Sequence, residues 1–97
     1  MRAIYIEPTG QQVSVADVDG SPAGFRELLG AVPHRAARLP NGDIVLAARG
    51  QNREFTMGGS QPIKGAAIVL GKLTRFREHR PAKSDASSIK RLIRWVS

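Results

Sequence analysis

The sequence predicts a small α+β domain in which one helix covers a mostly antiparallel sheet of five or six strands, followed by a C-terminal amphipathic helix. The chain has 97 residues, which suits a single small core. Its apolar segments are short and bounded by glycine and proline turns, as strands are, and only one segment before the C-terminal quarter has helical spacing. The predicted order of the domain is therefore ββαββββ.

Two strands are predicted at the start of the chain. Residues 1–7 alternate weakly between two apolar faces, which predicts a strand buried to some degree on both sides. Residues 8–10, Pro-Thr-Gly, end this strand. Residues 11–19 place Val13 and Val15 on one face before the pattern shifts phase, which predicts a short strand or a strand with a bulge. The two strands are expected to form a hairpin.

A helix is predicted after this hairpin. Ser21 can cap its first free N–H groups, and Pro22 suits the first turn because its missing donor costs nothing there. Gly30 is placed to end the helix in a left-handed conformation. One apolar stripe is expected to lie on the sheet, and it consists of Phe25, Leu28 and Leu29.

The remaining strands of the domain follow a second hairpin. Residues 34–39 and 44–48 flank a turn containing Asn41-Gly42, a step that tolerates the positive φ angles of a tight hairpin. Residues 53–57 alternate apolar and polar side chains, which predicts an edge strand. Residues 63–76 contain the longest apolar run, Ala-Ala-Ile-Val-Leu, and are predicted to be a central strand.

The predicted domain organisation has three parts. Residues 1–78 form the compact α+β domain, and residues 79–84 are interpreted as a linker because they are polar and interrupted by Pro81. Residues 85–97 are predicted to form a basic amphipathic helix capped by Ser84 or Asp85. Its apolar stripe consists of Ile89, Leu92, Ile93 and Val96, with Lys90, Arg91 and Arg94 on the opposite face.

Positive charge is concentrated at the C-terminal end. Residues 1–71 contain seven Lys or Arg against six acids, whereas residues 72–97 contain eight against two. This asymmetry predicts a nearly neutral body with a basic appendage that contacts a polyanion. The alternative is that the helix docks on the body and its charges only face solvent. The predicted nucleic-acid-binding residues are Lys72, Arg75 and Arg77 on the last strand, Arg80 and Lys83 in the linker, and Lys90, Arg91, Arg94 and Trp95 on the helix.

The stretch GGSQPIKGAAIVLGK, residues 58–72, contains the glycines and lysine of a phosphate-binding loop but not their spacing. A Walker loop needs Gly, four residues, Gly-Lys and then Ser or Thr. Here five residues separate Gly65 from Gly71-Lys72, and Leu73 stands where the hydroxyl belongs. The apolar residues between the glycines suit a strand, whose N–H groups bond to neighbouring strands. No nucleotide cofactor is therefore expected.

Candidate catalytic and metal-ligating residues are few. There is no cysteine, which excludes a thiolate nucleophile, thiolate metal ligands and disulfides. The two histidines, His34 and His79, stand beside arginines, and His79 is expected to be solvated in the linker. Asp17, Asp19 and Asp43 fall at turns, where local hydrogen bonding accounts for them. A catalytic triad or a zinc site needs more groups at close spacing, so the sequence favours a non-enzymatic protein.

Several of these segments together resemble a family. The opening MRAIYIEPTGQQV, a helix ending LLGAV, the hairpin RLPNGDIVLAARG and the closing PIKGAAIVLGK are similar to domain of unknown function family 3846, found in phages, plasmids and bacteria. The resemblance covers about residues 1–72 and leaves the basic tail uncovered. It implies an origin in a mobile element and implies no catalytic residues. Family members usually carry an acidic stretch after the hairpin, where residues 48–52 here are basic to neutral.

The sequence therefore predicts a phage- or plasmid-type accessory protein that binds nucleic acid through its C-terminal basic surface, mainly by phosphate contacts. Trp95 is expected either to stack on a base or to close the core. The alternative function is a protein-interaction module, for example an inhibitor that meets an acidic partner or fills a groove with its helix. No signal peptide or membrane span is expected. A cytoplasmic location is expected, and a dimer is compatible with the small core.

Overall fold

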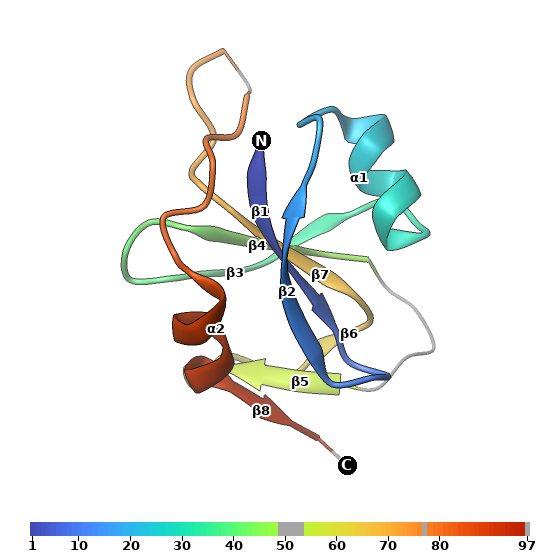
Figure 1. Ribbon diagram of the computed structural model, residues 1–97, viewed down its shortest axis with the longest axis vertical. Coiled ribbons are helices and arrows are strands. Elements are labelled where there is room, and N and C mark those ends of the chain that lie inside the picture. The colour runs from blue at the N-terminus through green and yellow to red at the C-terminus, as the bar shows by residue number, and fades with distance from the viewer. Residues whose placement is uncertain (49–53, 77, 97) are drawn as a thin grey trace.

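The computed structural model describes residues 1–48, 54–76 and 78–96 and has an α+β fold with antiparallel strands and two helices (Figure 1). The predicted fold class is confirmed at this level, but the order is ββαβββββαβ and not ββαββββ. The elements are β1 (Arg2–Glu7), β2 (Gln12–Asp17), α1 (Pro22–Leu29), β3 (His34–Arg38), β4 (Ile44–Ala47), β5 (Glu54–Met57), β6 (Ile63–Lys64), β7 (Ala67–Leu70), α2 (Ala86–Leu92) and β8 (Ile93–Trp95).

The described strands form two sheets, where the sequence predicted one. The first sheet has five strands in the order β2-β1-β7-β4-β3, and the second has three in the order β6-β5-β8. All pairings within them are antiparallel. Strand β7 lies at the centre of the larger sheet, as its continuous apolar run predicts.

The inner strands of the larger sheet are buried on both faces, and this accounts for their doubly apolar sequences. Along β1, Ile4 and Ile6 point to one face and Ala3 to the other, because successive side chains of a strand alternate. The first face packs against the smaller sheet and α2, and the second packs against α1. Figure 1 shows the two helices on opposite sides of the molecule. The predicted covering position of the first helix is confirmed for Phe25 and Leu29, whereas Leu28 of the predicted stripe is exposed.

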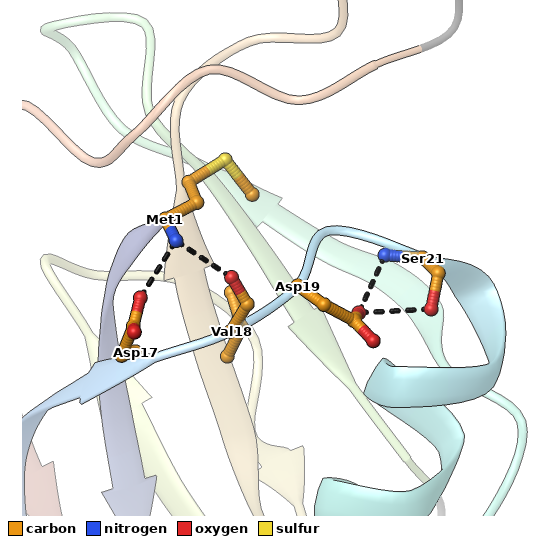
Figure 2. A network of polar contacts seen from close by, with 5 residues as sticks. All are labelled: Met1, Asp17, Val18, Asp19 and Ser21. Atoms are coloured by element: carbon orange, nitrogen blue, oxygen red, sulfur yellow. Dashed lines mark hydrogen bonds and ion pairs between the residues drawn. The ribbon is translucent and has the colours of Figure 1, made fainter.

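Polar contacts at the start of α1 follow the predicted capping pattern. The Ser21 hydroxyl accepts a hydrogen bond from the Gly24 N–H at 3.0 Å, and Pro22 occupies the first turn. Gly30 ends the helix at φ 80°. Figure 2 shows that the Asp19 carboxylate in turn accepts hydrogen bonds from the Ser21 N–H and hydroxyl, both at 2.8 Å. In the same view the Met1 amino group lies near Asp17 and Val18.

Both predicted hairpins are present, and only one of them is irregular. Strands β1 and β2 pair without interruption, so the bulge considered for residues 11–19 is absent there. The irregularity lies in β3, where the register shifts between Arg35 and Ala37. The β3–β4 turn is closed by a 3.0 Å bond from the Gly42 N–H to the Leu39 carbonyl, with Gly42 at φ 95°.

The predicted helix over residues 85–97 is wrong in its second half. Helix α2 ends at Leu92, and β8 continues from Ile93, which has φ −81° and ψ 136°. Strand β8 pairs with β5, and this also corrects the prediction that residues 53–57 form an edge strand, since β5 is the middle strand of its sheet. The open side of β5 gives backbone partners to a segment whose Ile and Trp side chains favour strands.

The predicted strand over residues 63–76 is also shorter than expected. It divides into β6 and β7, separated by a turn in which Gly65 has φ 85°. Residues after Leu70 leave the sheet, so Arg75 lies in a turn and not on a strand face. Arg77, the other basic residue predicted there, lies outside the described residues.

Candidate nucleic-acid interface

The segment interpreted as a linker lies against the body of the protein. The buried carboxylate of Asp43 accepts hydrogen bonds from the Lys83 N–H at 3.0 and 3.1 Å and from the Ser84 N–H at 2.8 Å. The Ser84 hydroxyl donates a further bond to Asp43 at 2.7 Å. A buried carboxylate is stable only when its lone pairs are satisfied, and these donors satisfy it. Asp43 thus fixes the backbone that carries Lys83.

Strand β1 holds the same segment from the other side. The Arg2 guanidinium donates to the carbonyl oxygens of Ala82 at 3.1 Å and Ser84 at 3.0 Å. The Ala82 N–H donates to the Arg2 carbonyl at 3.1 Å, and the Ala82 side chain is buried in the core. Residues 82–84 therefore have a defined path across the ends of the inner strands β1 and β4, and this path fixes the backbone that carries the neighbouring cations.

Residues 71–76 and 78–80 lie in a loop, the 71–80 loop, that projects beyond the end of the sheet at the top of Figure 1. At its base the Gly71 N–H donates to the Arg80 carbonyl at 2.7 Å, and the Arg80 N–H donates to the Lys72 carbonyl at 3.2 Å. Further out, the Thr74 N–H donates to the Glu78 carbonyl at 2.8 Å. These bonds make the 71–80 loop a hairpin-like projection rather than a continuation of β7.

His79 is part of this projection and is not the solvated residue that the sequence predicted. Its Nδ1 lies 2.9 Å from the Gly71 carbonyl oxygen, and its ring meets that of Phe25 edge to face with centroids 6.0 Å apart. The side chain is half-buried. His79 therefore connects the base of the 71–80 loop to α1.

The structure brings together four of the predicted binding residues at this loop. Lys72, Arg80 and Lys83 line one hollow of about 280 Å³. Lys72 and Arg80 also line the adjoining hollow together with Arg75. All four side chains are exposed. Cations that share a concave surface reinforce one another's attraction for an anion such as a phosphate.

The other three predicted basic residues that the structure describes lie further along the C-terminal quarter. Lys90 and Arg91 are exposed on α2, and Arg94 is exposed on β8, where it pairs across from Thr56. Helix α2 is capped by Asp85, whose side chain accepts the Ser88 N–H at 2.7 Å. That hydrogen bond lowers the pKa of Asp85, and the charges of Arg2 and Arg91 lower it further. The basic residues therefore form two groups on one continuous stretch of chain.

The cations of the C-terminal quarter are not neutralised by the body of the protein, as far as the structure describes it. Among residues 1–48, 54–76 and 78–96, the ion pairs join Met1 to Asp17 and Lys64 to Glu54. Neither pair includes a basic residue after position 71. The charge of the described basic residues after position 71 is therefore available to an external anion.

The two aromatic residues of this region differ in exposure. Trp95 is half-buried and packs edge to face on the core residue Phe55, with ring centroids 6.0 Å apart. Of the two roles expected for Trp95, the structure thus places it at the core. Phe76, which the sequence analysis passed over, is 72% exposed on the 71–80 loop. The Arg75 guanidinium lies 5.0 Å from the centre of the Phe76 ring.

The candidate catalytic residues are dispersed. His34 lines a hollow of about 590 Å³ between β3 and β6, whose described lining contains no carboxylate. Asp17 and Asp19 lie at the other side of the larger sheet, near the start of α1 (Figure 2). Within the described parts of the chain, no group of three or more His, Asp or Glu side chains is arranged to hold a metal ion. The glycine-rich stretch leads into β7, whose residues pair with β1 and β4.

The residues that sequence reasoning missed are Asp43 as a long-range anchor and Phe76 as an exposed ring. Asp43 follows an Asn-Gly turn, where local hydrogen bonding is enough to explain an aspartate. Its contact with Ser84 could therefore not be inferred from the sequence. A signal for Phe76 was available, since the only Phe in the basic quarter stands between two arginines. Such aromatic and basic residues side by side are typical of single-strand binding surfaces.

Comparisons of this chain with protein-family models, with curated proteins and with solved structures found no match. The resemblance to domain of unknown function family 3846 therefore stays a prediction.

Helix α1 has eight residues and α2 has seven, so neither of these two described helices has the length of an apolar membrane-crossing segment.

Proposed function

We propose that this protein is a non-enzymatic accessory protein of the phage or plasmid type that binds nucleic acid through the basic surface of its C-terminal quarter. The observation that carries the proposal is the convergence of Lys72, Arg80 and Lys83 on one hollow, with Arg75 beside it. Such a surface attracts phosphates by charge and by release of counterions, largely without regard to sequence.

The anchoring of this surface supports binding over a merely solvated tail. Lys83 is held by the bonds of its backbone to Asp43, and Arg80 by the bonds to Gly71 and Lys72. A fixed backbone loses less conformational entropy on binding than a mobile one. The attachment points of the basic side chains are therefore fixed, and the contribution of each to affinity should be measurable by substitution.

Charge substitution is the appropriate test, because deletion of residues 79–97 would remove part of the core. Ile89 and Ile93 are buried, and β8 covers one side of β5. We would compare the unaltered protein with the triple variant Lys72→Gln, Arg80→Gln, Lys83→Gln. The matched control removes the same charge elsewhere, on α1, β3 and β6, through Arg26→Gln, Arg35→Gln and Lys64→Gln.

The measurement is a titration with single-stranded and duplex DNA at several salt concentrations. The unaltered protein and the control should bind with affinity that falls steeply as salt rises. In the triple variant of the basic hollow, the slope of log affinity against log salt should decrease by about 1 for each phosphate contact removed. Absence of binding at low salt, or equal slopes for the two triple variants, would refute the proposal.

An acidic protein partner is the alternative that such a failure would favour, since the same exposed cations would complement it. The version of this alternative in which the C-terminal helix fills a partner's groove has less support. The apolar side of α2 already packs into the core through Ile89, which is fully buried. Helix α2 would have to leave the body before that surface became available.

A further inference from the structure

We infer that the 71–80 loop binds single-stranded nucleic acid by stacking an unpaired base on the ring of Phe76. This inference deepens the proposed function and rests on it. It names the form of nucleic acid and a residue that recognises bases rather than phosphates.

Phe76 is highly exposed, and Leu73, which lines the same hollow, is exposed as well. It is the most exposed of the large hydrophobic side chains that the structure describes, at 72%, and it sits at the outer turn of a projecting loop. A phenyl ring in this position loses the free energy that burial would give, about 2 kcal/mol. Phe76 and Leu73 together expose apolar surface on one hollow that is rimmed by cations, an arrangement typical of a ligand-contact site.

The groups around Phe76 are cationic. The Arg75 guanidinium lies 5.0 Å from the ring centre, which leaves the other ring face for a ligand. Lys72 and Arg80 line the same hollow as Arg75 and Phe76, and its other lining residues are Leu73 and Thr74. A ring flanked by cations matches a nucleotide, whose planar base and charged phosphate lie a few ångströms apart. A purely apolar partner would leave these cations desolvated and unpaired.

Single strands are favoured over duplexes for a geometric reason. In a duplex each base is already stacked between its neighbours and cannot be reached by a side chain without unstacking. In a single strand the base faces are accessible, and aromatic side chains stack on them with little dependence on sequence. Trp95, the other aromatic residue of the basic quarter, is half-buried against Phe55 and so cannot offer a ring in the same way.

The first test uses fluorescence anisotropy of a labelled oligothymidylate of about 12 nucleotides and of a labelled duplex, at low salt. Phe76→Ala should weaken binding of the oligothymidylate about tenfold and leave duplex binding within twofold. Phe76→Tyr should retain most of the affinity, because the ring remains. Val32→Ala is the control, since it removes an exposed apolar side chain, 67% accessible, that lies outside the 71–80 loop, and it should leave binding of both nucleic acids unchanged.

A second variant reports stacking directly. Phe76→Trp combined with Trp95→Phe moves the single tryptophan of the chain to the loop. Its fluorescence should be quenched when the oligothymidylate binds, whereas the fluorescence of Trp95 in the unaltered protein should change little. Thermal unfolding of each variant checks that the fold is retained, which the exposure of Phe76 leads us to expect.

The outcomes separate this inference from the proposed function. If the unaltered protein binds both nucleic acids and Phe76→Ala binds the oligothymidylate equally well, the stacking inference is wrong and the phosphate surface stands. If the tryptophan moved to position 76 is not quenched on binding, the inference is likewise wrong. If neither nucleic acid binds at low salt, both proposals fail, and a protein ligand for the loop takes their place.

Discussion

The side chain of Asp43 accepts hydrogen bonds from both the backbone N–H and the hydroxyl of Ser84, a residue 41 positions further along the chain. Both residues are buried. The Asn41 side-chain amide donates to the same Ser84 hydroxyl at 2.9 Å, so the hydroxyl is an acceptor as well as a donor. This contact joins the β3–β4 turn to the start of the basic quarter and sets the direction in which the chain enters α2.

Replacement of Asp43 should destabilise the protein as a whole. In Asp43→Asn the remaining oxygen can still accept from Lys83 and Ser84, but the NH2 group lies against the Lys83 N–H, and the negative charge that strengthens all of these buried hydrogen bonds is lost. The expected loss is about 3 kcal/mol in the free energy of unfolding. In a domain of this size, such a loss lowers the melting temperature by roughly 10–20 °C. Thermal unfolding followed by circular dichroism would measure it.

The matched control is Glu27→Gln, which makes the same carboxylate-to-amide change at an exposed position of α1. It should leave the free energy of unfolding within about 0.5 kcal/mol of the unaltered value. Equal melting temperatures for the two variants would show that the Asp43 contact does not hold the C-terminal quarter in place.

Gly71 is predicted to be intolerant of any side chain. A Cβ atom added there would lie 2.6 Å from the Pro81 carbonyl oxygen and 2.7 Å from that of Arg80, and backbone atoms cannot move aside as a flexible side chain can. Gly71→Ala should therefore force the base of the 71–80 loop apart. The expected cost is about 3 kcal/mol, at the upper end of the range for overpacking. Urea unfolding followed by Trp95 fluorescence would measure it.

Gly59→Ala separates this steric effect from backbone strain. Gly59 has φ 84°, so alanine is strained there, but nothing lies within 4 Å of the added Cβ. Its cost should be smaller, about 1–2 kcal/mol. If Gly71→Ala were the milder of the two variants, Gly71 would not lie as close to the backbone of Arg80 and Pro81 as the structure has it.

The parts of the fold that the sequence predicted are those set by local chemistry. Ser21 and Gly30 mark the ends of α1 because their preferences act within one turn of the chain. The continuous apolar run of β7 predicts its central position, because a strand buried on both faces has no polar side. Each of these signals is contained within a few neighbouring residues, and each was interpreted correctly.

The parts that sequence reasoning missed depend on contacts between distant residues. Ile93 fits the apolar stripe of a helix, and only the open side of β5 makes a strand the better solution there. The anchoring of residues 82–84 was missed for the same reason, because the hydrogen bonds to the Asp43 side chain come from Ser84, 41 positions further along the chain. Phe76 was missed for another reason, since its exposure follows from the early end of β7, which the apolar pattern did not indicate.

The cap of α2 gives a pH dependence whose direction follows from the structure. The Ser88 N–H, bonded to the Asp85 carboxylate at 2.7 Å, holds the pKa of Asp85 below its usual value of 3.8. In the unfolded chain this hydrogen bond is absent, so in acid the unfolded state binds a proton more readily than the folded state. The contribution to stability is therefore complete above about pH 5 and lost as the pH falls through the folded pKa. Asp19, whose pKa is lowered by its bonds to Ser21, acts in the same direction.

Asp85→Asn should flatten this acid dependence while keeping the helix, because asparagine is also a good N-cap but does not titrate. Urea unfolding at a series of pH values from 3 to 7 would give the free energy of unfolding, with Trp95 fluorescence as the signal. Near neutral pH the variant should resemble the unaltered protein, and in acid it should become the more stable of the two, because its cap is not lost by protonation. Ser87→Ala, an exposed change on α2 that removes no titrating group, should retain the full slope. If Asp85→Asn retains it as well, the carboxylate does not cap α2 in solution.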